Sequence, residues 1–420
     1  MTEFEINLEK YAALAVHTGV NVQKDQTLVV NAPLAAVELV RKIAKKAYEA
    51  GAKNVHVEWN DDELSLLKYQ LAPDAAFTEY PMWKVTGMEE MAEKGASFLT
   101  IYGPNPDLLK TIPPDRVATA NKTNALAMQN FLHYLMTDKA CWSVIAFPTK
   151  EWARKVFPES ISIEEAITKL WNVIFEVNRI YAQDPIELWK THITHLTKTA
   201  KFLNDKQYDQ LIYKAPGTNL NVELPKNHIW KGGAAISAAG VQFSPNMPTE
   251  EVYTMPHKDG VNGIVRSTKP LNYSGNVIDQ FSLTFEHGEV IDFTAEVGYE
   301  TLKLLLASDE GARRLGEVAL VPHHSPISMT ELIFYNTLFD ENASCHLAFG
   351  KAYPVNIVNG AQMTEEDMVK HGVNTSLVHV DFMIGSAEMN IDGMTKEGIR
   401  EPLLRNGNWV VSFNQLHNRI

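Results

Sequence analysis

Apolar and polar residues alternate in two different ways along this chain, and the change falls near residue 210. Before it, apolar residues recur at helical spacing or gather in short runs, and after it stretches with a period of two predominate. A period of 3.6 residues predicts helices, whereas a period of two predicts half-buried strands. We therefore expect two domains of different architecture, at residues 1–210 and 211–420.

The first part predicts repeated strand–helix–strand units. The expected strands are 27–31, 54–59, 97–102 and 142–147, and helices are expected at 4–18, 37–48 and 88–94. Gly51 follows the 37–48 segment, where a left-handed glycine commonly ends a helix. Strands joined through a helix pair in parallel. The pattern is that of an α/β domain with a mainly parallel sheet.

Long helices at 162–182 and 185–204 end the first part, and the second opens on Asp184-Pro185, a cap residue followed by proline. His192 and His195 lie three positions apart on it. They could share a metal ion, but no third ligand lies nearby in sequence. We therefore expect an exposed helix face.

The second part predicts a β-rich α+β domain. Strands are expected at 220–224, 277–284 and 290–294, with turns at 286–288 and at Asp392-Gly393, and one helix at 299–307. Residues 414–420 show no periodicity, which predicts a loose tail.

The stretch 376–385 carries the first candidate chemistry. Apolar residues alternate there with His379 and Asp381, so these two side chains share one strand face about 7 Å apart. An imidazole beside a carboxylate suits zinc or cobalt. Taken alone, the pair is a weak signal for a metal, and an exposed histidine that a neighbouring acid orients explains it better.

Three further segments, 246–254, 313–321 and 344–353, set an acid or a histidine among apolar or small residues. An ionised carboxylate is costly to bury unless it is paired or binds a cation. Glu317 looks buried and could pair with Arg313 or Arg314 instead of a metal. His346 could be a hydrogen-bonded core histidine. Cys345 beside it is no nucleophile–base pair, because adjacent strand side chains diverge.

Charge and cysteine content exclude several classes of protein. The net charge of -13 argues against nucleic acid or an anionic membrane as a partner. Two cysteines about 200 residues apart exclude a cysteine zinc cage and disfavour a disulfide framework. The N-terminus lacks a signal-peptide pattern and no apolar run approaches 18 residues. We expect a cytoplasmic protein.

The segments 246–254, 313–321, 346–353 and 379–381, in this order and spacing, resemble the thermophilic aminopeptidase family of two-metal metallopeptidases, the aminopeptidase T and aminopeptidase S type. The resemblance covers essentially the whole chain. It implies a cytosolic homodimer that removes N-terminal residues from peptides with a free N-terminus, and two metal ions in the C-terminal domain. Carried over by position, the metal-binding residues are Glu251, Glu317, His346, Tyr353, His379 and Asp381.

Such a site would use two divalent ions about 3.5–4 Å apart, one to activate a water and one to polarise the scissile carbonyl. Carboxylates with imidazoles suit zinc, cobalt or manganese better than calcium. We expect Glu317 to bridge the ions. Tyr353 would ligate weakly or donate a hydrogen bond to the oxyanion.

Glu250 places a second carboxylate next to the ligand Glu251. Two-metal aminopeptidases of unrelated fold have a base directly before a ligand glutamate, and by that analogy Glu250 is the candidate general base. A hydrogen-bonding role behind the ligands, or plain exposure, fits Glu250 equally well.

Two other functions remain open from the sequence. A two-metal phosphoesterase or amidase would be one, but a phosphate needs cations and these segments offer only Arg313, Arg314 and Lys351. A carrier with structural metals would be the other, but structural zinc sites are closed and mostly built from cysteine.

Overall fold

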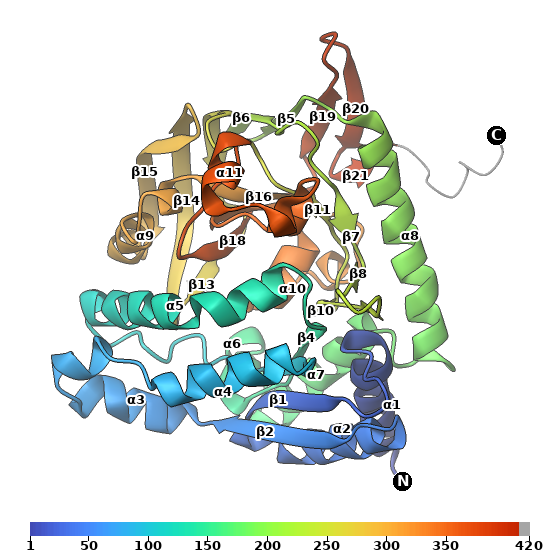
Figure 1. Cartoon of the computed structure of the whole chain (residues 1–420). Helices are drawn as coiled ribbons and strands as arrows, with labels where there is room; N and C mark the ends of the chain where they lie inside the picture. Colours follow the sequence, from blue (N-terminus) through green and yellow to red (C-terminus); the bar gives the residue numbers. More distant parts are fainter. Residues whose placement is uncertain (411–420) are drawn as a thin grey trace. The chain divides into compact units, whose positions relative to one another are not determined.

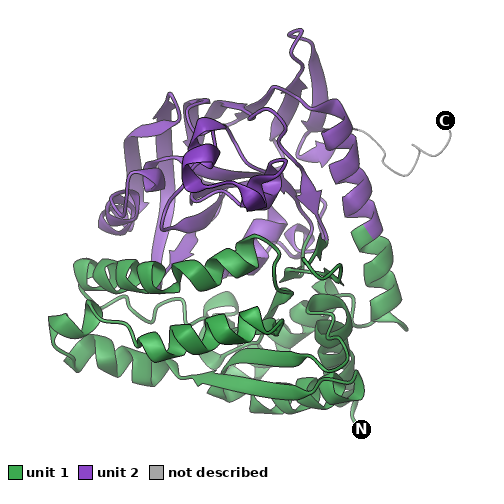
Figure 2. Ribbon diagram, viewed as in Figure 1, with its two compact units in different colours: residues 1–193, 234–249 green, residues 194–233, 250–420 purple. Residues whose placement is uncertain are grey.

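The structure is a computed structural model that describes residues 1–410. The chain forms two compact units (Figure 2). The first contains residues 1–193 and 234–249, and the second contains 194–233 and the chain from Glu250 onward. The division at residue 210 stays a prediction, because compact packing does not show which part folds on its own. The tail 414–420 lies outside the described residues.

The first unit is built on a parallel sheet of five strands in the order β10-β4-β3-β1-β2 (Figure 1). The strands are β1 Thr27–Pro33, β2 Asn54–Asn60, β3 Ser97–Tyr102, β4 Trp142–Ala146 and β10 Asn246–Met247. The four strands expected from the sequence are therefore present and parallel. β10 pairs with β4, which explains why residues 234–249 belong to this unit. A two-stranded ribbon, β8 Ala235–Ile236 and β9 Gln242–Phe243, precedes β10.

Helices cover this sheet through the side chains that alternate along its strands. Val29 and Phe98 pack with Ala92 of α4 and Phe131 of α5. Tyr11 of α1 instead bonds through its hydroxyl to the backbone of Ala146 in β4. The helices of the unit are α1 Glu3–Leu14, α2 Val37–Glu49, α3 Asp62–Leu71, α4 Met82–Glu93, α5 Pro114–Met136, α6 Lys150–Val156 and α7 Ile163–Val177.

Several helix boundaries differ from the expected ones. α1 continues into a π-helical turn, Ala15–Gly19. α2 is followed by Gly51 with φ +96°, the left-handed residue expected there. α7 ends at Val177 and not at 182, because Arg179 adopts a left-handed φ of +61° that no α-helix accommodates. α8, Pro185–Lys206, runs from the first unit into the second.

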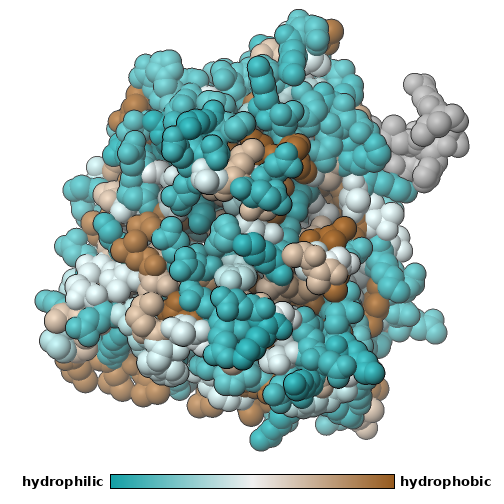
Figure 3. Space-filling model, in the orientation of Figure 1, coloured by the Kyte–Doolittle hydropathy of each residue, from teal (hydrophilic) through white to brown (hydrophobic). Residues whose placement is uncertain are grey.

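The surface of the first unit includes an apolar patch over α3, visible at the lower left of Figure 3. α3 buries none of its residues. It exposes Leu64, Leu67 and Leu71, which share one helix face. Met82 and Trp83 at the start of α4 are also exposed. Among residues 1–410, no helix is long and apolar enough to cross a membrane.

The second unit contains a nine-stranded sheet, and its strands pair antiparallel. The strands are β5 Gln210–Ala215, β6 Thr218–Glu223, β12 Val261–Arg266, β13 Leu271–Tyr273, β14 Asn276–Glu286, β15 Glu289–Val297, β19 Asn390–Met394, β20 Arg400–Arg405 and β21 Asn408–Trp409. The helices of the unit, besides the end of α8, are α9 Tyr299–Leu306, α10 Thr337–Asp340 and α11 Glu365–Lys370. The β-rich α+β fold expected for this part is confirmed.

A smaller antiparallel sheet in the same unit has the order β18-β17-β16-β11-β7. Its strands are β7 Lys231–Gly232, β11 Val252–Thr254, β16 Leu315–Leu320, β17 His346–Gly350 and β18 His379–Met383. One face of this sheet and one face of the nine-stranded sheet share a single apolar core, to which Val318, Leu347, Phe349 and Phe382 contribute. The other face of the smaller sheet is therefore available for polar side chains.

Of the two turns predicted from the sequence, one prediction is wrong and the other is confirmed. Asp392-Gly393 lies within β19 and makes no turn. The glycine is needed there because a Cβ at Gly393 would stand 2.7 Å from ring atoms of Tyr208. The turn at 286–288 does form, with φ values of +47° at His287 and +80° at Gly288.

Candidate metal centre

Strand register brings the candidate ligands together on the polar face of the smaller sheet. Glu317 of β16 pairs with Ala348 of β17, which in turn pairs with Asp381 of β18. Directly paired residues of antiparallel strands share a face. His346 lies two residues from Ala348 and therefore points the same way. The small side chain of Ala348 leaves space between the two carboxylates.

His379 and Glu251 are the remaining candidate ligands, and strand pairing places both of them beside this face. His379 pairs with Gly350 and is two residues from Asp381, so it follows the same face. Glu251 directly precedes β11, which pairs with β16. Ligand atoms gather into two groups, within each of which they lie less than 4.8 Å apart: Glu251, Glu317 and His346, and Glu317, His379 and Asp381. Glu317 belongs to both, the position expected of a bridging ligand.

Glu317 does not form the arginine pair that the sequence left open. Arg313 lies 3.4 Å from Glu289, and Arg314 lies 2.9 Å from Asp259. The Glu317 side chain instead faces the two imidazoles, at 3.5 Å from His346 Nε2 and 3.7 Å from His379 Nε2.

Backbone hydrogen bonds orient both imidazoles. His346 Nδ1 lies 3.0 Å from the Ser344 carbonyl, and His379 Nδ1 lies 2.7 Å from the Lys351 carbonyl. Because a carbonyl only accepts, each Nδ1 carries the proton and donates. Each Nε2 then faces the carboxylates with either a second proton or a lone pair. Metal-binding histidines commonly show this arrangement, with the remote ring nitrogen bonded to a backbone carbonyl.

The burial of several carboxylates in this cluster indicates whether a divalent cation would fit there. Glu251 and Glu317 are only 6% and 5% exposed. Two carboxylate atoms, Glu251 Oε2 and Asp381 Oδ1, are buried without hydrogen-bond partners among the described residues, although each lies near an imidazole nitrogen, at 3.0 and 3.6 Å. Burial and the nearby Asp381 charge raise the pKa of Glu317 above its ordinary value. Buried, crowded carboxylates with unmet acceptor capacity fit divalent cations.

Tyr353 lies beside this cluster. Its ring meets His379 edge-on, with centroids 4.9 Å apart. Burial, together with the Glu317 and Asp381 carboxylates, raises the pKa of the Tyr353 phenol well above its ordinary value. The phenol therefore keeps its proton and can donate a hydrogen bond.

Glu250 is buried next to Glu251 but belongs to neither group of ligand atoms. Its backbone N–H donates to Asn342 Oδ1 at 2.8 Å. Burial excludes the exposed acid that the sequence left open, so a base or a hydrogen-bonding role remains.

Sequence reasoning missed Glu341, a further acid of this cluster. It lies on a 3-10 turn, Glu341–Ala343, and is buried. Burial, followed by the charges of Asp381 and Glu251, raises the pKa of Glu341 well above its ordinary value. The signal in the sequence was an acid five residues before His346, but no strand periodicity singled it out.

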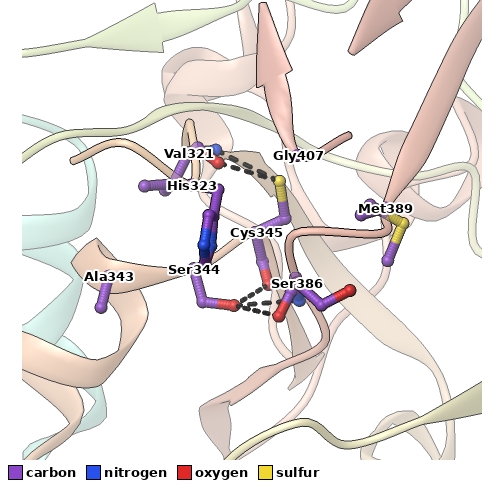
Figure 4. Close-up of a pocket in the computed structure, with 9 residues that line it drawn as sticks. Val321, His323, Ala343, Ser344, Cys345, Ser386, Met389 and Gly407 are labelled. Atoms are coloured by element: carbon purple, nitrogen blue, oxygen red, sulfur yellow. Dashed lines mark hydrogen bonds between the residues drawn. The ribbon is translucent and has the colours of Figure 1, made fainter. Parts of the chain in front are cut away.

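The other candidates do not join the metal centre. His195 is exposed as expected, whereas His192 is half-buried and bonds through Nε2 to the Thr249 carbonyl at 2.7 Å. Cys345 lines a small pocket with Ser344 and Met389 (Figure 4). Its thiol donates to the Val321 carbonyl, and burial raises its pKa to about 11. Cys345 is thus an inert buried thiol.

The second unit presents buried carboxylates and imidazoles on one sheet face, a set of side chains typical of a metal-binding protein. A family model described as thermophilic metalloprotease (M29) matches residues 4–409. Aminopeptidase 2 of Geobacillus stearothermophilus is 62% identical, across 98% of this chain and 99% of that protein. Aminopeptidase AmpS of Bacillus subtilis (strain 168) is 51% identical, across 98% of this chain and 100% of that protein.

A solved structure agrees. The wild-type AmpT structure from Thermus thermophilus matches with a TM-score of 0.90 and 43% identity, covering 97% of this chain and 100% of that one. The chain belongs to the thermophilic metalloprotease (M29) family, and it is a metal-dependent peptidase. The resemblance found in the sequence is confirmed.

Proposed function

We propose that this peptidase is an aminopeptidase that hydrolyses the N-terminal peptide bond with two divalent metal ions. The convergence of Glu251, Glu317, His346, His379 and Asp381 on one sheet face carries the proposal. The relatives named aminopeptidase support the exopeptidase activity.

Charge supports two ions. Burial, together with the charges of Asp381 and Glu251, raises the pKa of both Glu317 and Glu341, and two divalent cations would neutralise these four carboxylates. Glu251 with His346 would hold one ion and His379 with Asp381 the other, and Glu317, which belongs to both groups of ligand atoms, would contribute to both. Carboxylate and imidazole donors suit zinc, cobalt or manganese. Bound ions would acidify a water and polarise the scissile carbonyl.

The chain itself would supply the proton transfers. A Glu250 carboxylate oxygen would take a proton from the attacking water and pass it to the nitrogen of the departing amine. The Tyr353 hydroxyl would donate a hydrogen bond to the carbonyl oxygen as negative charge develops on it. His346 and His379 would keep their Nδ1 protons on backbone carbonyls, so each Nε2 stays turned toward the carboxylates.

Substrate modification tests the exopeptidase activity. A carboxylate-rich site can hold an ammonium group, so peptides with a free α-amine should be cleaved and their N-acetylated forms should resist. Chelator treatment should remove the activity, and added zinc, cobalt or manganese should restore it. Cleavage of acetylated peptides at the same rate would make the protein an endopeptidase or a broader amidase.

We also propose a homodimer, as the family resemblance implies. The exposed apolar side chains of α3 and α4, Leu71 at 77% and Trp83 at 71% exposure among them, offer a surface suited to association. Light scattering at micromolar concentration should give about twice the chain mass of 47.1 kDa. A mass near that of one chain would contradict the dimer. The cytoplasmic location stays a prediction.

A further inference from the structure

The buried amide of Asn342 links two acidic segments of the metal centre. Asn342 is 0% exposed. Its Oδ1 accepts the backbone N–H of Glu250 at 2.8 Å, and its Nδ2 donates to Glu341 Oε1 at 3.2 Å and to the Leu338 carbonyl at 3.0 Å. Glu250 and Asn342 are 92 residues apart in sequence, so this one side chain fixes the distance between two separate segments.

The partners leave one orientation for this amide. Its oxygen faces an N–H group, and its nitrogen faces two acceptors, so a flipped amide would place like groups together at all three contacts. The turn that carries Asn342 also lies against β18, the strand of His379 and Asp381. A change in this amide would therefore act on the carboxylate of Glu341 and on the main chain beside Glu251.

We propose that Asn342 is a positioning residue of the metal centre, which holds the Glu341 carboxylate and the Glu250–Glu251 backbone in the arrangement that binds the ions. The inference rests on the proposed function, because it assumes that these carboxylates face metal ions. Asn342 itself would touch neither a metal ion nor the substrate. Groups that orient metal ligands typically change metal affinity or activity by about 10–100-fold when replaced.

Two substitutions remove the link in different ways. Asn342→Asp keeps the size and one acceptor oxygen but places the other oxygen against Glu341 Oε1 and the Leu338 carbonyl. Asn342→Ala removes all three hydrogen bonds without adding charge. Asn178→Asp is the matched control, since Asn178 is also 0% exposed and its Nδ2 donates to the Ile174 carbonyl at 2.9 Å, in the first unit.

Zinc affinity, measured by competition with a chromogenic chelator on the purified full chain, tests the proposal apart from catalysis. Both Asn342 variants should bind zinc at least about tenfold more weakly than the wild type. With zinc in excess, kcat should fall while KM changes little. Asn178→Asp should lower the melting temperature and leave zinc affinity unchanged.

Different results would overturn the proposed function and the positioning role of Asn342. A wild-type protein that binds no zinc, cobalt or manganese would overturn the proposed function. A wild type that binds zinc, with Asn342 variants of equal affinity, would overturn the positioning role alone. Tighter binding by Asn342→Asp would show that charge, and not orientation, governs this position, and would also overturn it. Loss of folded protein in both Asn342 variants, judged by circular dichroism, would assign Asn342 to stability instead.

Discussion

Replacing His379 or Asp381 by alanine is expected to abolish peptide hydrolysis and to lower the amount of bound metal. Both side chains lie on one face of β18 and form a group of ligand atoms with Glu317. A metal ion contributes several kcal/mol of transition-state stabilisation, so losing it should reduce kcat/KM by at least about 10³-fold. Steady-state kinetics and metal analysis on the same protein samples would measure both effects.

His195→Ala provides the control, because it removes an imidazole from an exposed position on α8, away from both groups of ligand atoms. That variant should keep the wild-type rate and metal content. Full metal content and normal turnover in the His379 and Asp381 variants would refute the assignment of these ligands.

Glu250→Gln and Glu251→Gln should reduce peptide hydrolysis through different effects. A general base contributes about 10²–10⁴-fold in rate. Glu250→Gln keeps size and hydrogen bonding but removes the basic oxygen, so kcat should fall by that factor while metal content and substrate binding survive. Glu251 contributes an atom to the group with Glu317 and His346, so Glu251→Gln should lose or weaken one metal and reduce both metal content and rate.

The comparison is informative because neighbouring buried residues receive the same isosteric change. Normal turnover by Glu250→Gln would mean that the proton acceptor lies elsewhere, with Glu317 as a remaining candidate. Loss of metal from Glu250→Gln would instead make Glu250 a ligand or a support for one.

The fold could be predicted where local pattern and packing agree. β1, α2 and β2 follow from an apolar run, an amphipathic helix and the left-handed Gly51. α5 was missed because only Val117 and Phe131 of its 23 residues are buried, too few to give a helical period. Gly393 was misread as part of a turn, since its reason, the ring of Tyr208, comes from a distant segment.

The residues of the candidate site could likewise be predicted only where the local sequence pattern specifies their position. His379 and Asp381 could be found because strand alternation marks a shared face, and the structure places both residues on β18, two positions apart and paired with Gly350 and Ala348 of β17. Glu341 could not, because it reaches the cluster from a 3-10 turn whose position depends on tertiary contacts. The competing arginine pair for Glu317 could be rejected only once Arg313 and Arg314 were seen beside Glu289 and Asp259.

Anomalous X-ray scattering from crystals of the zinc-loaded protein tests directly whether two metal ions bind at the proposed ligands. Data collected on both sides of the zinc absorption edge would locate each ion independently of the refined protein atoms. Two peaks per chain are expected, one among Glu251, Glu317 and His346 and the other among Glu317, His379 and Asp381. A map with no peak at these side chains, or with zinc bound only elsewhere on the chain, would contradict this expectation.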